Sequence, residues 1–188
     1  MQQLHSMPNS KRLVTAEDLE RMPEDDFRYE LVEGRILRMS PVGGVHGGLT
    51  AGFIALLVTH VKAARIGAVA TELGFILARN PDTVRAPDIA FINRERIPAG
   101  GLPKGFWNGA PDLAVEVLSP DDRPSDVRTK VDEYLACGTG LVLVVDPDEQ
   151  TVCAHRRGAP PLTLGVNDTL DLDDAVPGFR CRVREIFE

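Results

Sequence analysis

Two apolar segments, RAPDIAFI at residues 85–92 and DLAVEVLS at residues 112–119, decide how this chain folds. Each is typical of a strand buried in a sheet, and each carries one acid, Asp88 in the first and Glu116 in the second. An ionised carboxylate inside an apolar sheet is costly unless a cation compensates its charge. We therefore expect a positive group beside both acids.

Lys130 is the candidate cation. It lies in a segment, residues 124–136, that begins with a proline and is followed by Gly138, as a helix often does. Lys130 falls within the arc of the apolar stripe of this helix, which is formed by Val127, Val131, Tyr134 and Leu135. The spacing therefore predicts that the ammonium points toward the sheet. The alternative is a surface pair with Asp126, one turn earlier.

The remaining elements follow from turn and capping signals. A capping box at residues 15–18 predicts a short helix to about residue 22, and a glycine turn predicts a hairpin over residues 29–39. Downstream we expect a glycine-rich loop (40–48), a helix (48–65), three strands (68–78, 84–92 and 113–118), a Gly/Pro-rich loop (98–111) before the third, the helix at 124–136, a buried strand (141–145) and further strands from 151 onward.

Length and composition indicate one domain. The chain has 188 residues, of which 43% are hydrophobic, and we expect a loose tail at residues 1–12 and a single domain at residues 13–188. The net charge of -7 gives no global attraction to nucleic acid, so any such site is local. The three cysteines form no CxxC pair. No signal peptide or membrane segment is predicted, and we expect a cytoplasmic location.

Five segments, taken in order, resemble the bacterial Uma-type family of restriction endonucleases, within the restriction-endonuclease-like PD-(D/E)XK superfamily. They are YELVEG (29–34), RAPD (85–88), VEVLSP (115–120), Lys130 with Tyr134, and VVDP (144–147). The likeness covers roughly residues 13–187. It implies an α/β fold with a core of helix, three strands, helix and strand in a mixed sheet, extended by an N-terminal helix and β-hairpin and by C-terminal strands.

The resemblance also implies roles for individual residues. Asp88 and Glu116 become the metal-binding acids, joined by the main-chain carbonyl of Val117, and Glu30 becomes a further catalytic acid. The superfamily's lysine, two residues after the glutamate, is replaced here by Leu118. In the Uma-type family Lys130 fills its place. The implied cofactor is Mg²⁺ or Mn²⁺, which oxygen ligands suit.

Three residues are candidates for binding substrate. His46 lies in the glycine-rich segment 43–48 ahead of a helix, where anions bind, although a capping loop is the simpler interpretation. Arg128 can contact a phosphate backbone, although scattered surface arginines are common. Tyr134 accompanies Lys130 in the family pattern.

These observations predict a Mg²⁺-dependent DNA endonuclease in which Asp88, Glu116, Lys130 and Glu30 act together. Simpler interpretations stay open for the acids: a turn acid for Asp88, a structural ion pair with an arginine for Glu116, and a solvent-facing strand acid for Glu30. Two other functions also stay open. One is an inert domain of this fold that binds nucleic acid or a protein, and the other is a metal-dependent phosphohydrolase for a small substrate.

A double-strand cut requires two active sites, and the chain carries one such set of residues. We therefore expect a symmetric homodimer. Phe106 and Trp107 in the Gly/Pro-rich loop are expected to be exposed and to form its contact.

Overall fold

The computed structural model describes residues 12–23, 25, 27–39, 41 and 43–188. Its helices are α1 (Ala16–Glu20), α2 (Gly44–Ala64), η1 (Arg94–Arg96, a 3₁₀ turn), α3 (Pro124–Ala136) and α4 (Arg184–Phe187). Its strands are β1 (Arg28–Val32), β2 (Arg35–Met39), β3 (Gly67–Ala70), β4 (Phe75–Ala78), β5 (Thr83–Arg85), β6 (Ile89–Asn93), β7 (Trp107–Asn108), β8 (Leu113–Val117), β9 (Leu141–Asp146), β10 (Thr151–Arg156), β11 (Leu162–Gly165), β12 (Thr169–Asp171) and β13 (Arg180–Arg182).

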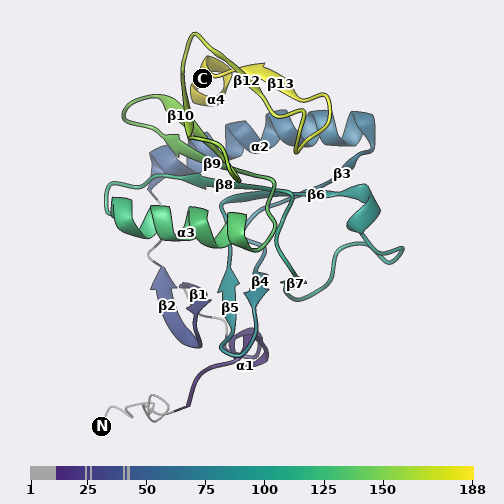
Figure 1. The fold of residues 1–188 in the computed structure, drawn as a ribbon, viewed down its shortest axis with the longest axis vertical. Coiled ribbons are helices and arrows are strands. Elements are labelled where there is room, and N and C mark those ends of the chain that lie inside the picture. The colour runs from purple at the N-terminus through teal and green to yellow at the C-terminus, as the bar shows by residue number, and fades with distance from the viewer. Residues whose placement is uncertain (1–11, 24, 26, 40, 42) are drawn as a thin grey trace.

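The strands form two main sheets. The upper sheet has the order β11-β10-β9-β8-β6-β3, with β8 and β9 parallel and the other pairs antiparallel. The lower sheet has the order β2-β1-β5-β4-β7, and a small sheet pairs β12 with β13. Figure 1 shows the lower sheet beneath α3 with α1 at its far end, while β12, β13 and α4 lie beyond α2 at the opposite end of the molecule.

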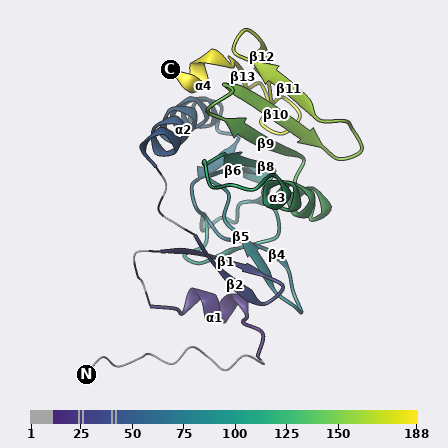
Figure 2. The ribbon, with the colours of Figure 1, turned by 90° about the vertical axis from the view of Figure 1, so that its left-hand side faces the viewer.

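Two helices cover opposite faces of the upper sheet (Figure 2). The buried side chains of α2 pack with Val115 and Val117 in the main core, whereas Val131 and Tyr134 of α3 pack with Ala114 on the other face. This division follows from the period of two along β8, because successive side chains point to opposite faces. Glu116 shares its face with Ala114 and therefore points toward α3.

Several sequence predictions are confirmed. The capping box joins Thr15 and Asp18 at α1, and β1 and β2 pair as a hairpin around the turn at Glu33 and Gly34. Gly34 has a φ of 73°, a conformation that glycine adopts without strain. The strand at β9 is buried along residues 141–145, and α3 spans the predicted residues.

Two of the predicted strands are wrong. Residues 68–78 divide into β3 and β4, and residues 84–92 divide into β5 and β6, so each predicted strand serves both main sheets. The break in the second falls at Pro87 and Asp88, because a proline lacks the N–H group that a central strand needs. Asp88 therefore precedes β6 and does not lie within it.

The glycine-rich loop is also shorter than predicted. Helix α2 begins at Gly44, so most of the predicted loop at 40–48 is helical; residues 40 and 42, like residues 1–11 of the predicted tail, lie outside the described residues. At 21 residues and with a mean hydropathy of 1.4 over 18 of them, α2 is long and apolar enough to cross a membrane by length and composition alone. Core helices meet the same criterion, and Phe53, Leu57 and Val61 of α2 pack in the main core.

The predicted exposure of the loop aromatics is wrong for Trp107. Its side chain is only 7% exposed and packs with Phe75, Ala90 and Ile92, because the short strand β7 adds it to the edge of the lower sheet. Phe106 is half-buried. This loop therefore does not present an exposed aromatic pair to a second subunit.

Candidate active site

Glu116 is buried beneath α3, and two side chains of that helix contact it. The Lys130 ammonium donates to Glu116 Oε2 at 3.0 Å, and the Tyr134 hydroxyl donates to Oε1 at 3.1 Å. Lys130 and Tyr134 are one helical turn apart, so they lie on the same side of α3. Glu116 is 8% exposed, and each oxygen of its carboxylate has a hydrogen-bond partner on α3.

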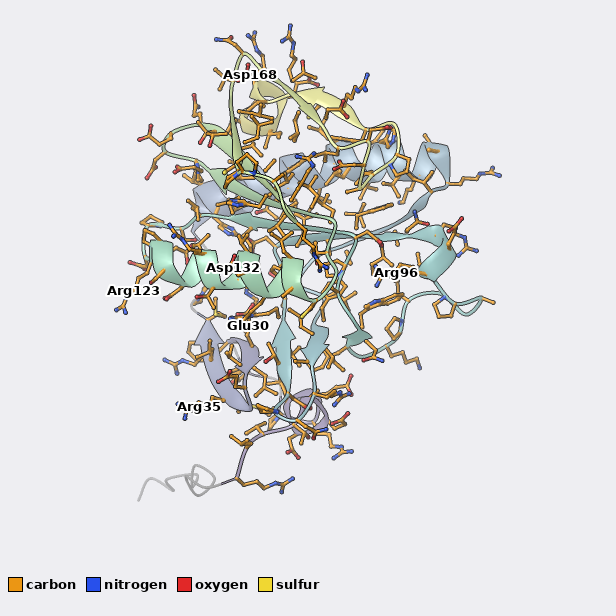
Figure 3. The ribbon with its side chains drawn as sticks, in the orientation of Figure 1. Glu30, Arg35, Arg96, Arg123, Asp132 and Asp168 are labelled. Carbon is orange, nitrogen blue, oxygen red and sulfur yellow. The ribbon has the colours of Figure 1, made fainter. Side chains whose placement is uncertain are left out.

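Glu30 enters the same cluster from the lower sheet. In Figure 3 it lies just below α3, where β1 meets the helix. Its Oε1 lies 3.4 Å from the Lys130 ammonium and accepts from the amide of Ala86 at 3.1 Å. Its Oε2 accepts from Arg85 Nη1 at 2.7 Å. Glu30 therefore does not face solvent as a simple strand acid would, because it is 2% exposed.

Arg85 links Glu30 to α3. Its guanidinium is buried, and its Nε donates to Glu133 Oε2 at 2.6 Å while Nη1 holds Glu30. Charges thus alternate along Glu133, Arg85, Glu30, Lys130 and Glu116. This chain of ion pairs joins the lower sheet, α3 and the upper sheet at a single point.

Asp88 lies beside this chain, at the start of β6. Its Oδ2 accepts from the amide of Val117 at 2.8 Å, and His46 Nε2 lies 3.1 Å from the same oxygen. Strands β6 and β8 are neighbours, paired through Ile89 and Val115, so Asp88, which directly precedes β6, lies next to the strand that carries Glu116. The Arg28 guanidinium is 3.9 Å from Asp88 Oδ1. The protein therefore brings together the acids that were 28 residues apart (116 − 88) in the sequence.

The pKa values show how strongly these groups are coupled. Burial raises the pKa of Glu116 to about 7, against the positive charge of Lys130 and with help from the negative charges of Asp88 and Glu30. Burial alone would lower the pKa of Lys130, but Glu116 and Glu30 raise it well above its ordinary value. The hydrogen bond to Asp88 raises the pKa of His46 although burial opposes it. Lys130 therefore stays charged, and Glu116 keeps its proton to a higher pH than an exposed glutamate does.

The donor set fits a hard divalent cation. Among the residues that the structure describes, no group of three or more His, Cys, Asp and Glu side chains is arranged to hold a metal ion. Mg²⁺ does not require such a cage, because it is commonly bound by one or two carboxylates and completed by water and substrate phosphate. Asp88 and Glu116 supply that pair, and burial, with the nearby charges of Asp88 and Glu30, raises the pKa of Glu116 although Lys130 opposes it.

The other predicted site residues have mixed outcomes. His46 lies in the first turn of α2 and its imidazole contacts Asp88, so it is part of the site and not of a capping loop. The backbone amide of Val117 donates to Asp88, and the backbone of Val117 also contributes to the raised pKa of His46. Arg128 is exposed on α3, and its side chain makes no hydrogen bond or ion pair within the described part of the chain. Lys130 pairs with Glu116 and Glu30, so the alternative pair with Asp126 is wrong.

Sequence reasoning missed Arg85, Glu133 and Arg28. Glu133 follows Lys130 by three residues, a spacing that places both on one side of a helix and that could have identified it. Arg85 was visible within the RAPD segment, but its role depends on where β5 separates from β6. Arg28 shares a strand face with Glu30, so the assignment of Glu30 to the site would also have predicted Arg28.

Comparison with known proteins agrees with this geometry. The chain is similar to a crystal structure from Anabaena variabilis that is described as a "putative nuclease" of the DUF820 family. The match covers 93% of this chain and 97% of that one, with 25% sequence identity and a TM-score of 0.82. No curated protein matched the chain. The fold is therefore restriction-endonuclease-like, as predicted.

The family follows from a second match. The Uma2 family, described as "Putative restriction endonuclease", matches residues 16–184. The chain belongs to the Uma2 family.

The cluster makes the stability of the protein depend on pH. The pKa of Glu116 in the folded state, about 7, lies above its ordinary value of 4.5, so the folded state binds more protons between these values. The free energy of unfolding should therefore fall as pH rises from about 4.5 to 7. The raised pKa of His46 extends this fall above pH 6.5. We expect the melting temperature, measured in EDTA by circular dichroism, to decrease from pH 5 to pH 8.

The matched variants assign this slope to Glu116. Glu116→Gln should flatten most of it, whereas Glu149→Gln, in an exposed turn, should leave it unchanged. If Glu116→Gln keeps the full wild-type slope, the acid is not buried as the structure places it.

Proposed function

We propose that this protein is a Mg²⁺-dependent endonuclease that hydrolyses phosphodiester bonds in DNA. The observation that carries the proposal is the position of Lys130, whose ammonium lies between Glu116 and Glu30 while Asp88, just before β6, binds the amide of Val117. Membership of a family described as restriction endonucleases supports the same class of reaction.

The site would hold the ion through Asp88, Glu116 and the main-chain carbonyl of Val117. Bound there, a divalent cation would lower the pKa of water and offset charge on the phosphate. Glu116 lies on β8, and Asp88 directly precedes the paired strand β6 and accepts from the amide of Val117, so the backbone holds both acids in place before any ligand arrives. Such preorganisation is what makes charged groups effective in a site that excludes solvent.

Lys130 would act on the reacting phosphate. Its ammonium is a compact charge on a flexible stem, and the raised pKa keeps it protonated at neutral pH. In this role it neutralises negative charge that develops on the phosphate oxygens. The Tyr134 hydroxyl donates to Glu116 Oε1, the oxygen that Lys130 does not bind. Glu30 forms a second ion pair with the Lys130 ammonium. His46 contacts Asp88 and keeps that carboxylate facing β8.

Cleavage of supercoiled plasmid tests this function. The wild-type protein should nick or linearise DNA with Mg²⁺ or Mn²⁺ and not with EDTA. Lys130→Met should lower the rate by about 100-fold or more, the usual effect of removing one group that stabilises transition-state charge. Binding of Mn²⁺ should change much less.

Lys62→Met is the matched control, because Lys62 is exposed in the last turn of α2, and this variant should cut at the wild-type rate. Equal trace nicking by wild type and Lys130→Met would mean that the activity comes from a contaminant. The protein would then be an inert domain of this fold.

The net charge of -7 favours a second candidate, a metal-dependent phosphohydrolase for a small substrate, because an acidic protein attracts long polyanions poorly. Release of phosphate from nucleotides, with plasmid left intact under the same conditions, would select this candidate.

The endonuclease also requires two sites for a double-strand cut, so we propose a symmetric homodimer. The contact is not the pair of loop aromatics, because Trp107 is buried within its own subunit. Light scattering at tens of micromolar should give twice the monomer mass of 20.5 kDa, and a monomer mass would contradict the proposal.

A further inference from the structure

A cleft opens on the side of β1 that faces α1, next to the candidate active site. Its volume is about 420 Å³, enough for one nucleobase. It lies between the chain that leads from α1 into β1 and the loops before β4 and β7. Side chains that line it include Met22, Phe27, Tyr29, Glu72, Leu73 and Phe106.

The aromatic rings of Phe27, Tyr29 and Phe106 line the cleft, and two of them are held in place by their neighbours. Phe27 is 37% exposed, and the Arg38 guanidinium covers its ring at 4.1 Å from the centroid. Phe106 packs on Gly74 so closely that a Cβ there would overlap its ring, and its amide donates to Glu20 at 2.9 Å. Flat, braced rings beside open space are suited to stacking on a base.

Acids outnumber cations in the lining of the cleft. Glu20, Asp25 and Glu72 bring negative charge to it and Lys104 brings one positive charge, so the lining as a whole repels the backbone of a nucleic acid. Asp25 is engaged by the Tyr29 hydroxyl at 2.7 Å, and Glu72 uses one oxygen to bind Arg28. The second oxygen of Glu72 has no hydrogen-bond partner within the described ranges, and the Glu72 side chain is 56% exposed. A carboxylate oxygen of this kind accepts from an amino group on a base.

Arg28 connects the cleft to the candidate active site. The same Nη1 atom lies 2.8 Å from Glu72 in the wall of the cleft and 3.9 Å from Asp88. Along β1, the side chains of Arg28 and Glu30 point toward the candidate active site, while that of Tyr29 lines the cleft. Strand β1 therefore separates the cleft from the candidate active site. A nucleotide close to the cut bond can pass the first residue of β1, Arg28, and enter the cleft.

We propose that this cleft, hereafter the aromatic cleft, takes an unstacked base of the nucleic-acid substrate close to the cut bond. The base carries an exocyclic amino group, as cytosine, adenine and guanine do, and this group donates to Glu72. The inference rests on the proposed nuclease function and adds a substrate subsite to it.

Photocrosslinking tests the subsite directly. Duplex DNA with 5-iodocytosine in place of cytosine is bound to excess wild-type protein, with EDTA and with Mn²⁺, then irradiated and analysed by mass spectrometry. Stacked iodinated bases should crosslink to Phe27, Tyr29 or Phe106. Phe27→Ala should lower the crosslink yield roughly tenfold, the scale of one lost base–aromatic stack.

Leu162→Ala is the matched control, because Leu162 is equally apolar, 53% exposed and located on β11 at the other end of the molecule. It should leave the yield unchanged. Metal-dependent cutting without crosslinks to the three rings, or an unchanged yield for Phe27→Ala, overturns the subsite and leaves the nuclease function standing. Failure of both cutting and DNA binding overturns the two together.

Discussion

Asp88→Asn is expected to reduce DNA cleavage by at least about 100-fold while the protein stays folded. The amide has the size of the carboxylate and can still accept from Val117, so the start of β6 should keep its position. It loses the charge that a divalent ion requires. The readouts are plasmid cleavage and Mn²⁺ affinity by calorimetry, both of which should fall.

Stability separates this effect from simple damage. Because the cluster contains more carboxylates than fixed cations, removing one charge relieves repulsion, and the melting temperature in EDTA should stay level or rise. Asp126→Asn, at an exposed position on α3, should change neither cleavage nor metal affinity. Full activity of Asp88→Asn would remove this acid from the mechanism.

Arg85→Met is expected to lower the melting temperature by about 10 °C. Arg85 is 4% exposed and pairs with both the buried Glu30 and the half-buried Glu133, so its loss removes one cation from both acids. Breaking a buried ion pair from one side typically costs about 3–5 kcal/mol. For a chain of this length each kcal/mol shifts the melting temperature by about 2–4 °C.

Two further variants assign that loss to charge. Arg35→Met is the control, since Arg35 is exposed on β2, and Figure 3 shows it at the outer edge of the lower sheet. It should shift the melting temperature by less than about 2 °C. Adding Glu30→Gln to Arg85→Met should recover part of the loss, because it removes a buried acid that has lost one of its two cationic partners. A shift of under 2 °C for Arg85→Met alone would show that Arg85 is not buried in this network.

The sequence predicted the elements whose signals are local. Helix α3 was predicted with its full length because Pro124 and Gly138 mark its two ends, and the hairpin was predicted from Gly34. Strand β8 was predicted because one face is apolar throughout and the other is interrupted only by Glu116. These same patterns placed Glu116 and Lys130 on facing surfaces.

The errors come from features that only the packing decides. The division of residues 84–92 into β5 and β6 depends on how two sheets share one stretch of chain, and the apolar pattern is the same with or without the break. The roles of Arg85 and Glu133 depend on that break, because it brings the end of β5 under α3. Trp107 was predicted to be exposed from its Gly/Pro-rich surroundings, yet two residues of β7 are enough to bury it.

The central claim is that Asp88 and Glu116 together hold the divalent ion that the cleavage requires. A crystal of the wild-type protein soaked in Mn²⁺ and measured for anomalous scattering tests it most directly. The account predicts a peak within about 2–2.5 Å of an oxygen from each carboxylate, with Lys130 moved away from Glu116 by the incoming charge. A peak elsewhere, or none at millimolar Mn²⁺ with Lys130 still bound to Glu116, would contradict it.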